Sequence, residues 1–385
     1  MDDYINDYVL PSDDEKSKKK SSRIVRVLVC IVVLLLIFAV VLCAFLVLRY
    51  TQDIDIDDGY DDVTGTYDDS FMYDEDDEDY SENYQTMLVL QSSTNLNDLL
   101  ADWYSNECEL MSSKYVMNFL LIGIDTFSST SSGNTDVMML VSVNTKTEQI
   151  ILTSILRDSY TYYETAYGSV TSKLNAAYSN GGPAYLVQAI EQNYKIEIDY
   201  YVAVDFTAFE EVIDLVGGVY CTVEKYEAAA IYAYAGVTTP VGENVLLNGE
   251  QALYFCRMRS IYTLGDVTRT ENQREVITSL INQASSLSVS ELDTLITTLT
   301  SYVRTDCSVS KIISLAATAL TNKWYEYEIV SETAPSEDAR LAYSGSSWIW
   351  VVDYPLAAQT VQLSIYGTTD IELSDERVTA FDLVK

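Results

Sequence analysis

The chain contains an unbroken apolar run, residues 27–48, with a basic segment on one side and a long acidic one on the other. A helix of about 22 residues reaches about 33 Å, which matches the hydrocarbon core of a bilayer. A cleavable signal peptide would have a shorter apolar core, of about 7–15 residues, and would end in small residues. Arg49-Tyr50-Thr51 follows the run instead. We therefore expect one retained transmembrane helix, which restricts any large globular fold to the residues beyond it.

The charges around this run predict its orientation. Six lysines and arginines lie between Lys16 and Arg26, whereas only Arg49 follows the run closely. The positive-inside rule then places the N-terminus in the cytoplasm and the rest of the chain outside the cell membrane, as a single-pass protein. No ATP pool is expected there, so an energy-rich bond would have to arrive on a lipid.

Differences in composition divide the chain into six segments. No lysine or arginine occurs between Tyr50 and Lys114, and closely spaced acidic residues and tyrosines fill the first part of this stretch. Like charges repel, so we expect an extended spacer; cation capture and tyrosine-mediated adhesion are the alternatives. The predicted organisation is a cytoplasmic tail (1–26), a transmembrane helix (27–49), an acidic linker (50–86), an accessory helical segment (87–114), a main domain (115–367) and a C-terminal tail (368–385).

The absence of histidine from the sequence excludes several kinds of chemistry. It removes Ser-His and Cys-His nucleophile pairs and most zinc sites. The six cysteines include no CxxC pair, and the sequence leaves open whether the four beyond the apolar run form disulfides. Catalysis would therefore depend on carboxylates, arginines, oxygen-bound metals or binding geometry.

The main domain shows apolar runs of strand length that alternate with segments of helical periodicity. The expected strands are residues 116–124, 137–143, 149–155, 200–204, 219–223, 348–352 and 360–365. The expected helices are residues 183–194, 206–215, 266–284, 290–303 and 308–320. Because many of the strands are wholly apolar, we predict an α/β fold with a central mixed β-sheet flanked by helices on both faces.

Clustered arginines in a chain of net charge −35 suggest an anion-binding site. On a strand, Arg257 and Arg259 would share a face, and on a helix Arg269 and Gln273 would be neighbours. A guanidinium binds phosphate oxygens in a bidentate way and does not deprotonate, so these residues favour a bound pyrophosphate. The alternative is a set of ordinary surface ion pairs.

Further candidates lie at the ends of the expected strands, where α/β folds bind ligands. Asp125 follows the first strand and Asp136 precedes the second, and two such carboxylates near a pyrophosphate suit Mg²⁺. Arg157, which precedes Asp158 directly, could pair locally or reach the same anion. Lys173 adds a further positive charge nearby in the sequence.

The order and spacing of these motifs resemble those of the LytR-CpsA-Psr family, which attaches glycopolymers to the cell wall of Gram-positive bacteria. The match is dense over about residues 118–280. Its segments are NFLLIGID (118–125), TDVMMLVS (135–142), SILRD (154–158), KLNAAY (173–178), DFTAF (205–209), VGGV (216–219), LNGEQA (247–252) and RMR (257–259), followed by Asp266, Arg269 and Gln273.

The resemblance implies an apolar tunnel for a polyprenyl chain. It also implies transfer of a phosphoglycosyl polymer, such as teichoic acid or capsule, from a polyprenyl-pyrophosphate carrier to peptidoglycan. Asp125 and Asp136 would hold Mg²⁺. The residues expected to bind the pyrophosphate are Arg157, Lys173, Arg257, Arg259, Arg269 and Gln273. The four arginines would also be catalytic, and no nucleic-acid partner is expected.

Two features of the chain bear on this expected activity. With no histidine present, Asp266 is our candidate base for the acceptor hydroxyl, although it could instead be the N-cap of the following helix. The family usually has an arginine two residues before the second metal aspartate, where this chain has Asn134. The alternatives are therefore a polyprenyl-pyrophosphate pyrophosphatase, or a non-catalytic regulatory protein that binds lipid or cell wall.

Overall fold

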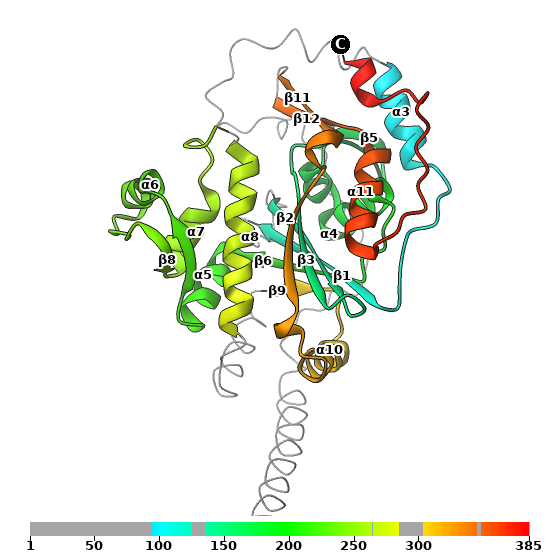
Figure 1. Cartoon of the computed structure of the whole chain (residues 1–385). Helices are drawn as coiled ribbons and strands as arrows, with labels where there is room; N and C mark the ends of the chain where they lie inside the picture. The colour runs from blue at the N-terminus through cyan, green and yellow to red at the C-terminus, as the bar shows by residue number, and fades with distance from the viewer. Residues whose placement is uncertain (1–93, 125–134, 264, 285–302, 345–347, 385) are drawn as a thin grey trace, which may run out of the picture. The chain divides into compact units, whose positions relative to one another are not determined.

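The computed structural model describes residues 94–124, 135–263, 265–284, 303–344 and 348–384 (Figure 1). The expected transmembrane run, the acidic linker, Asp125, Asn134 and all but the last residue of the helix expected at 290–303 lie outside these residues; that last residue, Val303, begins a strand instead. Among the helices that are described, none is long and apolar enough to cross a bilayer. Three free cysteines, Cys221, Cys256 and Cys307, are buried, and a fourth, Cys108, is exposed.

A six-stranded mixed sheet forms the centre of the fold, in the order β10-β3-β2-β1-β6-β9. Its strands are β1 (Val116–Ile124), β2 (Thr135–Asn144), β3 (Gln149–Ile155), β6 (Tyr200–Asp205), β9 (Val303–Thr305) and β10 (Glu328–Ala334). β1 runs antiparallel to β2 and parallel to β6, and β3 runs antiparallel to β2 and parallel to β10. The prediction of a central mixed sheet is confirmed.

The two faces of the sheet are buried to different extents. On one face, Leu120, Ile122 and Leu140 are fully buried and belong to the largest core cluster. This cluster also contains side chains of α4 (Asn175–Tyr194) and α11 (Tyr354–Tyr366). On the other face, Met139, Val143, Ile150 and Leu152 are buried in a smaller cluster, whereas Phe119 and Leu121 are only partly buried, beside residues of α8 (Gly265–Ala284).

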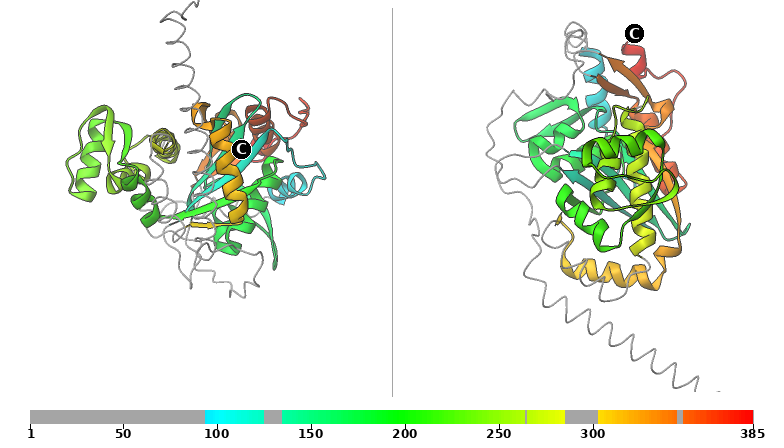
Figure 2. Two further views of the ribbon diagram at one scale, coloured as in Figure 1. Left: turned by 90° about the horizontal axis from the view of Figure 1, so that it is seen from below. Right: turned by 90° about the vertical axis from the view of Figure 1, so that its left-hand side faces the viewer.

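A separate lobe packs on the far side of α8 from the sheet (Figures 1 and 2). It consists of α5 (Phe206–Leu215), β7 (Val219–Val223), α6 (Lys225–Ala235), β8 (Gly242–Leu247) and α7 (Gly249–Arg257). β7 and β8 form an antiparallel pair, and the apolar sides of β7, α6 and α7 share a second buried cluster. α8 contacts both β7 and β3, so it connects the lobe to the sheet.

The remaining elements surround the first face and the ends of the sheet. They are α3 (Thr94–Tyr104), the hairpin of β4 (Tyr160–Thr165) and β5 (Gly168–Lys173), α10 (Val309–Thr321), the hairpin of β11 (Arg340–Ser344) and β12 (Trp348–Val352), and three short 3-10 helices at Trp324–Glu326, Glu337–Ala339 and Ala380–Leu383. Side chains of α3 belong to the same core cluster as α4 and β1.

One predicted strand, residues 360–365, is wrong, because these residues lie in α11. A proline opens this helix, and its buried residues recur at intervals of three and four, as at Ala357, Ala358, Val361 and Ile365. Gly367, at φ 70°, ends it in the left-handed conformation. The apolar residues of this segment therefore follow a helical period that a six-residue window is too short to reveal.

Candidate functional site

The proposed ligand-binding residues gather at one edge of the central sheet. Ile124 at the end of β1 pairs with Thr135 at the start of β2 and with Asp205 at the end of β6. The Thr135 hydroxyl donates to the Gly123 carbonyl at 3.0 Å, which fixes the start of β2. β3 ends at the same edge, so Asp136 and Arg157 are brought together from separate strands.

Arg157 lies at the centre of the site, and only 8% of its surface is exposed. Its guanidinium donates to the Asp136 carboxylate. Its Nε lies 3.6 Å from Asp158 Oδ2 and 3.5 Å from Asp266 Oδ1. Burial lowers the pKa of Arg157, but the charges of these three carboxylates more than reverse that effect and raise the pKa above its ordinary value. Arg157 is therefore a permanent cation held in place by three anions.

The first turns of α8 complete the cluster. Asp266 Oδ1 lies 2.6 Å from Arg269 Nη2, which also donates to the Asp136 backbone carbonyl at 3.3 Å. Burial raises the pKa of Asp266 despite the nearby guanidiniums of Arg269, Arg157 and Arg259. Burial and the charge of Arg157 lower the pKa of Arg269. The start of α8 thus places a carboxylate that is harder to ionise than usual between two arginines.

Lys173, at the end of β5, reaches the same cluster through Asp158. Its Nζ lies 2.9 Å from Asp158 Oδ1. Although burial acts in the opposite direction, Arg157 and Lys173 together lower the pKa of Asp158. Asp158 therefore links Lys173 to Arg157, a role suggested in the sequence only by its position next to Arg157.

The prediction that Arg257 and Arg259 share a strand face is wrong, because Arg257 ends helix α7. Asn248 and Gln251 form a capping box at the start of this helix, and its apolar side chains are buried on one side. The alternation of two arginines around Met258 suggests a strand, but the capping signal lies nine residues earlier in the sequence. Arg257 is exposed, with its guanidinium 4.5 Å from the centre of the Phe206 ring, and Arg259 is half-buried.

Gln273 lies on α8 one turn beyond Arg269, as predicted, but its side chain contacts the end of α7. Gln273 Nε2 donates to the Cys256 carbonyl at 3.1 Å, and Asn272 Nδ2 donates to the Phe255 carbonyl at 3.1 Å. These two amides fasten α7 to α8 immediately before Arg257. Asn272 is not among the residues predicted from the sequence, and it contacts the backbone of α7 only two residues before Arg257.

The cluster retains unused capacity to bind an anion. Nε of Arg157 and Nε of Arg269 are buried, and neither donates a hydrogen bond to any residue that the structure describes. Buried polar groups are rarely left without a partner, so these two N–H groups are suited to a ligand. The three cations Arg157, Lys173 and Arg269 are already balanced by three carboxylates, so an incoming anion would displace existing ion pairs.

A metal would have to rely on few carboxylates here. Within the described ranges, no group of three acidic, histidine or cysteine side chains is placed to hold an ion. Asp136 uses Oδ1 for Arg157 and is 23% exposed, which leaves its other oxygen accessible. Because Mg²⁺ typically binds one or two carboxylates and completes its shell with water and phosphate oxygens, Asp136 fits such an ion.

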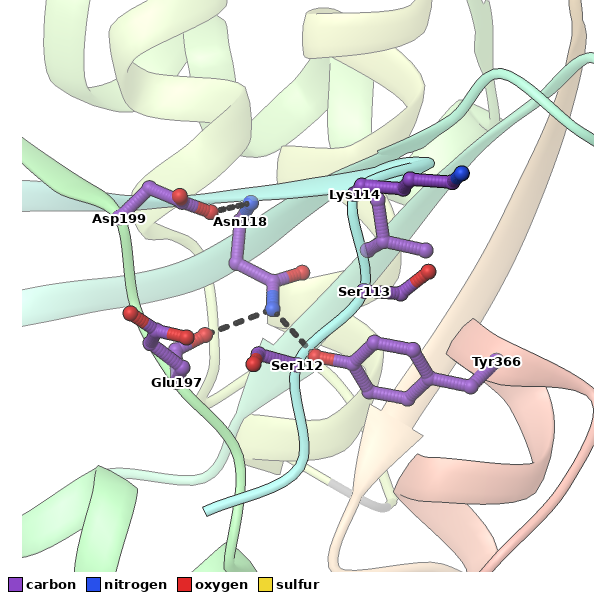
Figure 3. A pocket seen from close by; sticks show the side chains of 8 residues that line it. Ser112, Ser113, Lys114, Asn118, Glu197, Asp199 and Tyr366 are labelled. Carbon is purple, nitrogen blue, oxygen red and sulfur yellow. Dashed lines mark hydrogen bonds between the residues drawn. The ribbon is translucent and has the colours of Figure 1, made fainter.

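Two cavities lie away from the arginines. One, of about 230 Å³, lies at the opposite edge of the sheet, beside the start of β1 (Figure 3). There Asn118 donates from Nδ2 to the Glu197 carbonyl and to the Tyr366 hydroxyl. The other, of about 350 Å³, lies between α3 and the end of β12. Neither is lined by a residue of the arginine cluster, by which we mean Asp136, Arg157, Asp158, Lys173, Asp266 and Arg269.

The fold and the cluster together define a mixed α/β protein with buried guanidiniums at one sheet edge, suited to a small, highly charged anion. A model of the LytR-CpsA-Psr family matches residues 80–363, and the chain belongs to this family. The family resemblance inferred from the sequence motifs is confirmed.

Two curated relatives illustrate the range of names in the family. A polyisoprenyl-teichoic acid–peptidoglycan teichoic acid transferase TagU of Oceanobacillus iheyensis is 34% identical over 214 residues, which cover 54% of this chain and 64% of that protein. Biofilm regulatory protein A of Streptococcus mutans is 31% identical over 287 residues, covering 70% of this chain and 61% of that protein. The chain thus spans less than two thirds of the length of either relative.

Solved structures show the same fold. A protein of Streptococcus agalactiae has a TM-score of 0.58 and 27% identity, covering 69% of this chain and 91% of that one. TagT, solved with bound octaprenyl pyrophosphate lipid, has a TM-score of 0.51 and 23% identity, covering 70% and 97% of the two chains.

Proposed function

We propose that this protein transfers a phosphoglycosyl polymer from a polyprenyl-pyrophosphate carrier to peptidoglycan. The observation that carries the proposal is the pair of buried guanidiniums, Arg157 and Arg269, whose Nε groups have no hydrogen-bond partner among the described residues. The name of the relative TagU states this type of transfer, and TagT was solved with octaprenyl pyrophosphate bound. Both agree with a pyrophosphate as the anion.

The half-buried face of the sheet supports a binding surface for the polyprenyl chain. Phe119 and Leu121 of β1 point to this face, and their register partners on β6 and β2 include Val202 and Val141. All four are apolar and only partly buried, whereas core strands normally bury such residues completely. A lipid beside α8 would remove this apolar surface from water. The tunnel expected from the family would follow this face.

The proposed reaction breaks one phosphoanhydride bond and forms one phosphodiester bond. The oxygen of an acceptor sugar hydroxyl attacks the phosphorus that carries the glycan, and polyprenyl phosphate leaves with the bridging oxygen. Arg157 and Arg269 stabilise the charge on the phosphoryl oxygens, and the exposed Arg257 can reach the diphosphate from outside. Asp266 takes the hydroxyl proton, which its raised pKa favours.

A divalent ion would bind at the start of β2 in this scheme. Asp136 would supply its free carboxylate oxygen, and Asp125, which directly follows β1 in the sequence, would supply the second ligand. When bound, Mg²⁺ would neutralise charge on the diphosphate. We also propose that residues 27–49 anchor the protein in the cell membrane, with the enzymatic domain outside.

The full-length protein in detergent or nanodiscs tests this function. It is incubated with a glycan-bearing polyprenyl pyrophosphate, Mg²⁺ and a peptidoglycan oligomer. We expect glycan-linked oligomer and free polyprenyl phosphate. Release of glycan phosphate without linkage would identify a pyrophosphatase, and unchanged bound lipid would identify a non-catalytic binding protein; either result contradicts the proposal.

A conservative variant links the activity to the cluster. Arg157→Lys keeps the charge but loses the planar fork, so we expect the transfer rate to fall about 100-fold. The exposed Arg304 on β9 provides the matched control, and Arg304→Lys should retain the wild-type rate. Equal rates for both variants would exclude Arg157 from phosphate stabilisation.

A further inference from the structure

The lobe beyond α8 carries an unusual concentration of exposed aromatic side chains. Tyr220 and Tyr226 are 46% and 51% exposed, and Tyr232 and Tyr234 are 59% and 65% exposed. Exposed apolar surface of this extent on a soluble domain commonly marks a binding site. The catalytic cluster described above uses none of these rings.

Two aromatic pairs connect this lobe to the arginines. Tyr234 of α6 stacks on Tyr254 of α7, with ring centres 5.5 Å apart and planes inclined by 13°. Tyr226 of α6 packs edge-on against Tyr262, with ring centres 6.0 Å apart. Tyr226 and Tyr234 are eight residues apart on one helix, which places them on similar sides of α6 and about 12 Å apart along its axis. We call Tyr226, Tyr234, Tyr254 and Tyr262 the tyrosine surface.

Two residues of the tyrosine surface, Tyr254 and Tyr262, lie next to Arg257 and Arg259. Tyr254 precedes Arg257 by three residues on α7, so both lie on the same side of that helix. The Tyr262 backbone N–H donates to the Arg259 carbonyl at 3.0 Å. A molecule bound along the four rings would therefore reach the exposed guanidinium of Arg257 and lie beside Arg259, whose charge acts to lower the pKa of Asp266 in the arginine cluster.

The rings are held in place before any ligand arrives. The Tyr262 hydroxyl donates to Glu227 Oε1 at 2.6 Å and accepts from Asn272 Nδ2 at 2.7 Å. Glu227 also forms the capping box at the start of α6 with Glu224. Tyr234 has one ring face against Tyr254 and, at 65% exposure, leaves the other open. Preorganised flat rings bind a partner with a small loss of conformational entropy.

The charge of the lobe restricts what can bind there. Between Val219 and Glu250 the lobe exposes three glutamates, Glu224, Glu243 and Glu250, and one lysine, Lys225. This acidic surface would repel anionic lipid head groups and anionic polymers. Uncharged sugar rings are not repelled, and their C–H faces stack on aromatic rings while their hydroxyls bond to polar groups at the edge.

We propose that the tyrosine surface binds the sugar rings of the acceptor glycan strand and delivers its hydroxyl to the pyrophosphate. This inference rests on the proposed transfer function, and it names the site of the second substrate. The donor lipid would approach along the sheet face beside α8, and the acceptor would approach from the lobe, so the two substrates would meet at Arg257.

The test measures binding of two probes to the full-length protein. One probe is an oligomer of peptidoglycan glycan whose lactyl carboxyl groups are amidated and therefore uncharged, and the other is polyprenyl pyrophosphate without glycan. Tyr234→Ala removes the exposed stacking ring, and we expect oligomer affinity to fall about tenfold, in line with the loss of one stacked ring. Affinity for polyprenyl pyrophosphate should not change, and in turnover the KM for the acceptor alone should rise.

Tyr167→Ala is the matched control, because Tyr167 is 75% exposed in the turn between β4 and β5. It should bind both probes as the wild type does. Equal oligomer affinity for Tyr234→Ala and the wild type would overturn the inference. The inference would also fail if Tyr234→Ala kept its oligomer affinity but lost binding to anionic vesicles, which serve as a third probe. If wild-type protein bound the oligomer through Tyr234 but not the lipid, the transfer function would fail and the glycan site would stand.

Discussion

Asp266 occupies an environment with opposing effects on its charge. Arg269 and Arg157 favour the carboxylate, yet its side chain is only 8% exposed and burial raises its pKa overall. Its two oxygens are buried without hydrogen-bond donors of suitable geometry among the described residues, although Arg269 Nη2 lies 2.6 Å away. A buried carboxylate that binds a proton more readily than usual is suited to accept one from a substrate.

Asp266→Asn tests this role. Because a base must be ionised to act, and because the folded state raises this pKa, the wild-type transfer rate should begin to fall on acidification at a higher pH than an ordinary aspartate would give. The variant should lose about 100-fold in rate and also lose this acidic limb, measured as a pH–rate profile.

The effect of Asp266→Asn on the unfolding temperature can also be predicted in direction. With its pKa raised in the folded state, Asp266 costs folding free energy as the pH rises through that value. The variant should therefore not unfold at a lower temperature than the wild type at neutral pH. Unchanged turnover with intact folding would remove Asp266 from the mechanism.

At the level of single residues, the sequence predicted several of the side chains that gather but not how they pair, and it wrongly added Gln273, whose side chain contacts the end of α7. Asp136, Arg157, Lys173, Asp266 and Arg269 converge at one sheet edge, as their positions at strand and helix ends suggested. The pairing of Lys173 with Asp158 depends on where the β4–β5 hairpin ends. Such a turn is set by tertiary packing, which no local motif encodes.

Among the elements, α3 contacts the core through its apolar side chains and through one buried lysine. Lys195, the C-cap of α4 at φ 52°, is fully buried, and its Nζ donates to the Tyr104 and Asn106 carbonyls, each at 3.1 Å. The same ammonium lies 5.3 Å from the centre of the Trp103 ring. These contacts satisfy carbonyls at the end of α3 that the helix itself leaves without donors.

Lys195→Met should therefore destabilise the domain. The methionine keeps the apolar stem but leaves the buried Tyr104 carbonyl and the partly buried Asn106 carbonyl without their donor, which should cost about 2–3 kcal/mol of unfolding free energy in urea titrations. Lys323→Met is the control, because Lys323 has a side chain 57% exposed in a surface ion pair and its loss should cost little. Equal effects of the two substitutions would show that α3 is held by its apolar contacts alone.

The elements that could be predicted from the sequence were those with long apolar patterns. β3 and α5 have the predicted limits, and β1, β6 and α8 differ by a residue at most. β4, β5 and β10 have half-polar sequences, which give weak strand signals. β4 and β5 pair with each other across a short turn, whereas β10 pairs with β3, which is distant in the chain. The end of α7 was mistaken for a strand because Arg257, its last residue, alternates with Arg259 beyond the helix. Buried side chains of α7, such as Phe255 and Cys256, belong to the second core cluster.

For the whole molecule, the proposed chemistry requires the domain to lie outside the cell, where lipid-linked glycans and peptidoglycan meet. The family match supports the domain, but the orientation comes from the charge distribution around residues 27–48. With a net charge of −35, the chain is also expected to be repelled by an anionic bilayer, so an anchor would keep the site near a lipid substrate that electrostatics alone would not attract.

The exposed Cys108 allows this topology to be tested in intact cells that express the full chain. Cys221, Cys256 and Cys307 are buried and should not react with a membrane-impermeant maleimide, whereas Cys108 should. A Cys108→Ser variant that also carries Ser12→Cys in the N-terminal tail should be labelled only after the membrane is permeabilised. If residue 12 of this variant were labelled in intact cells, and Cys108 of the wild-type protein were not, the orientation would be the opposite of the predicted one. It would then separate the arginine cluster from any extracellular glycan, and the transfer function could not operate.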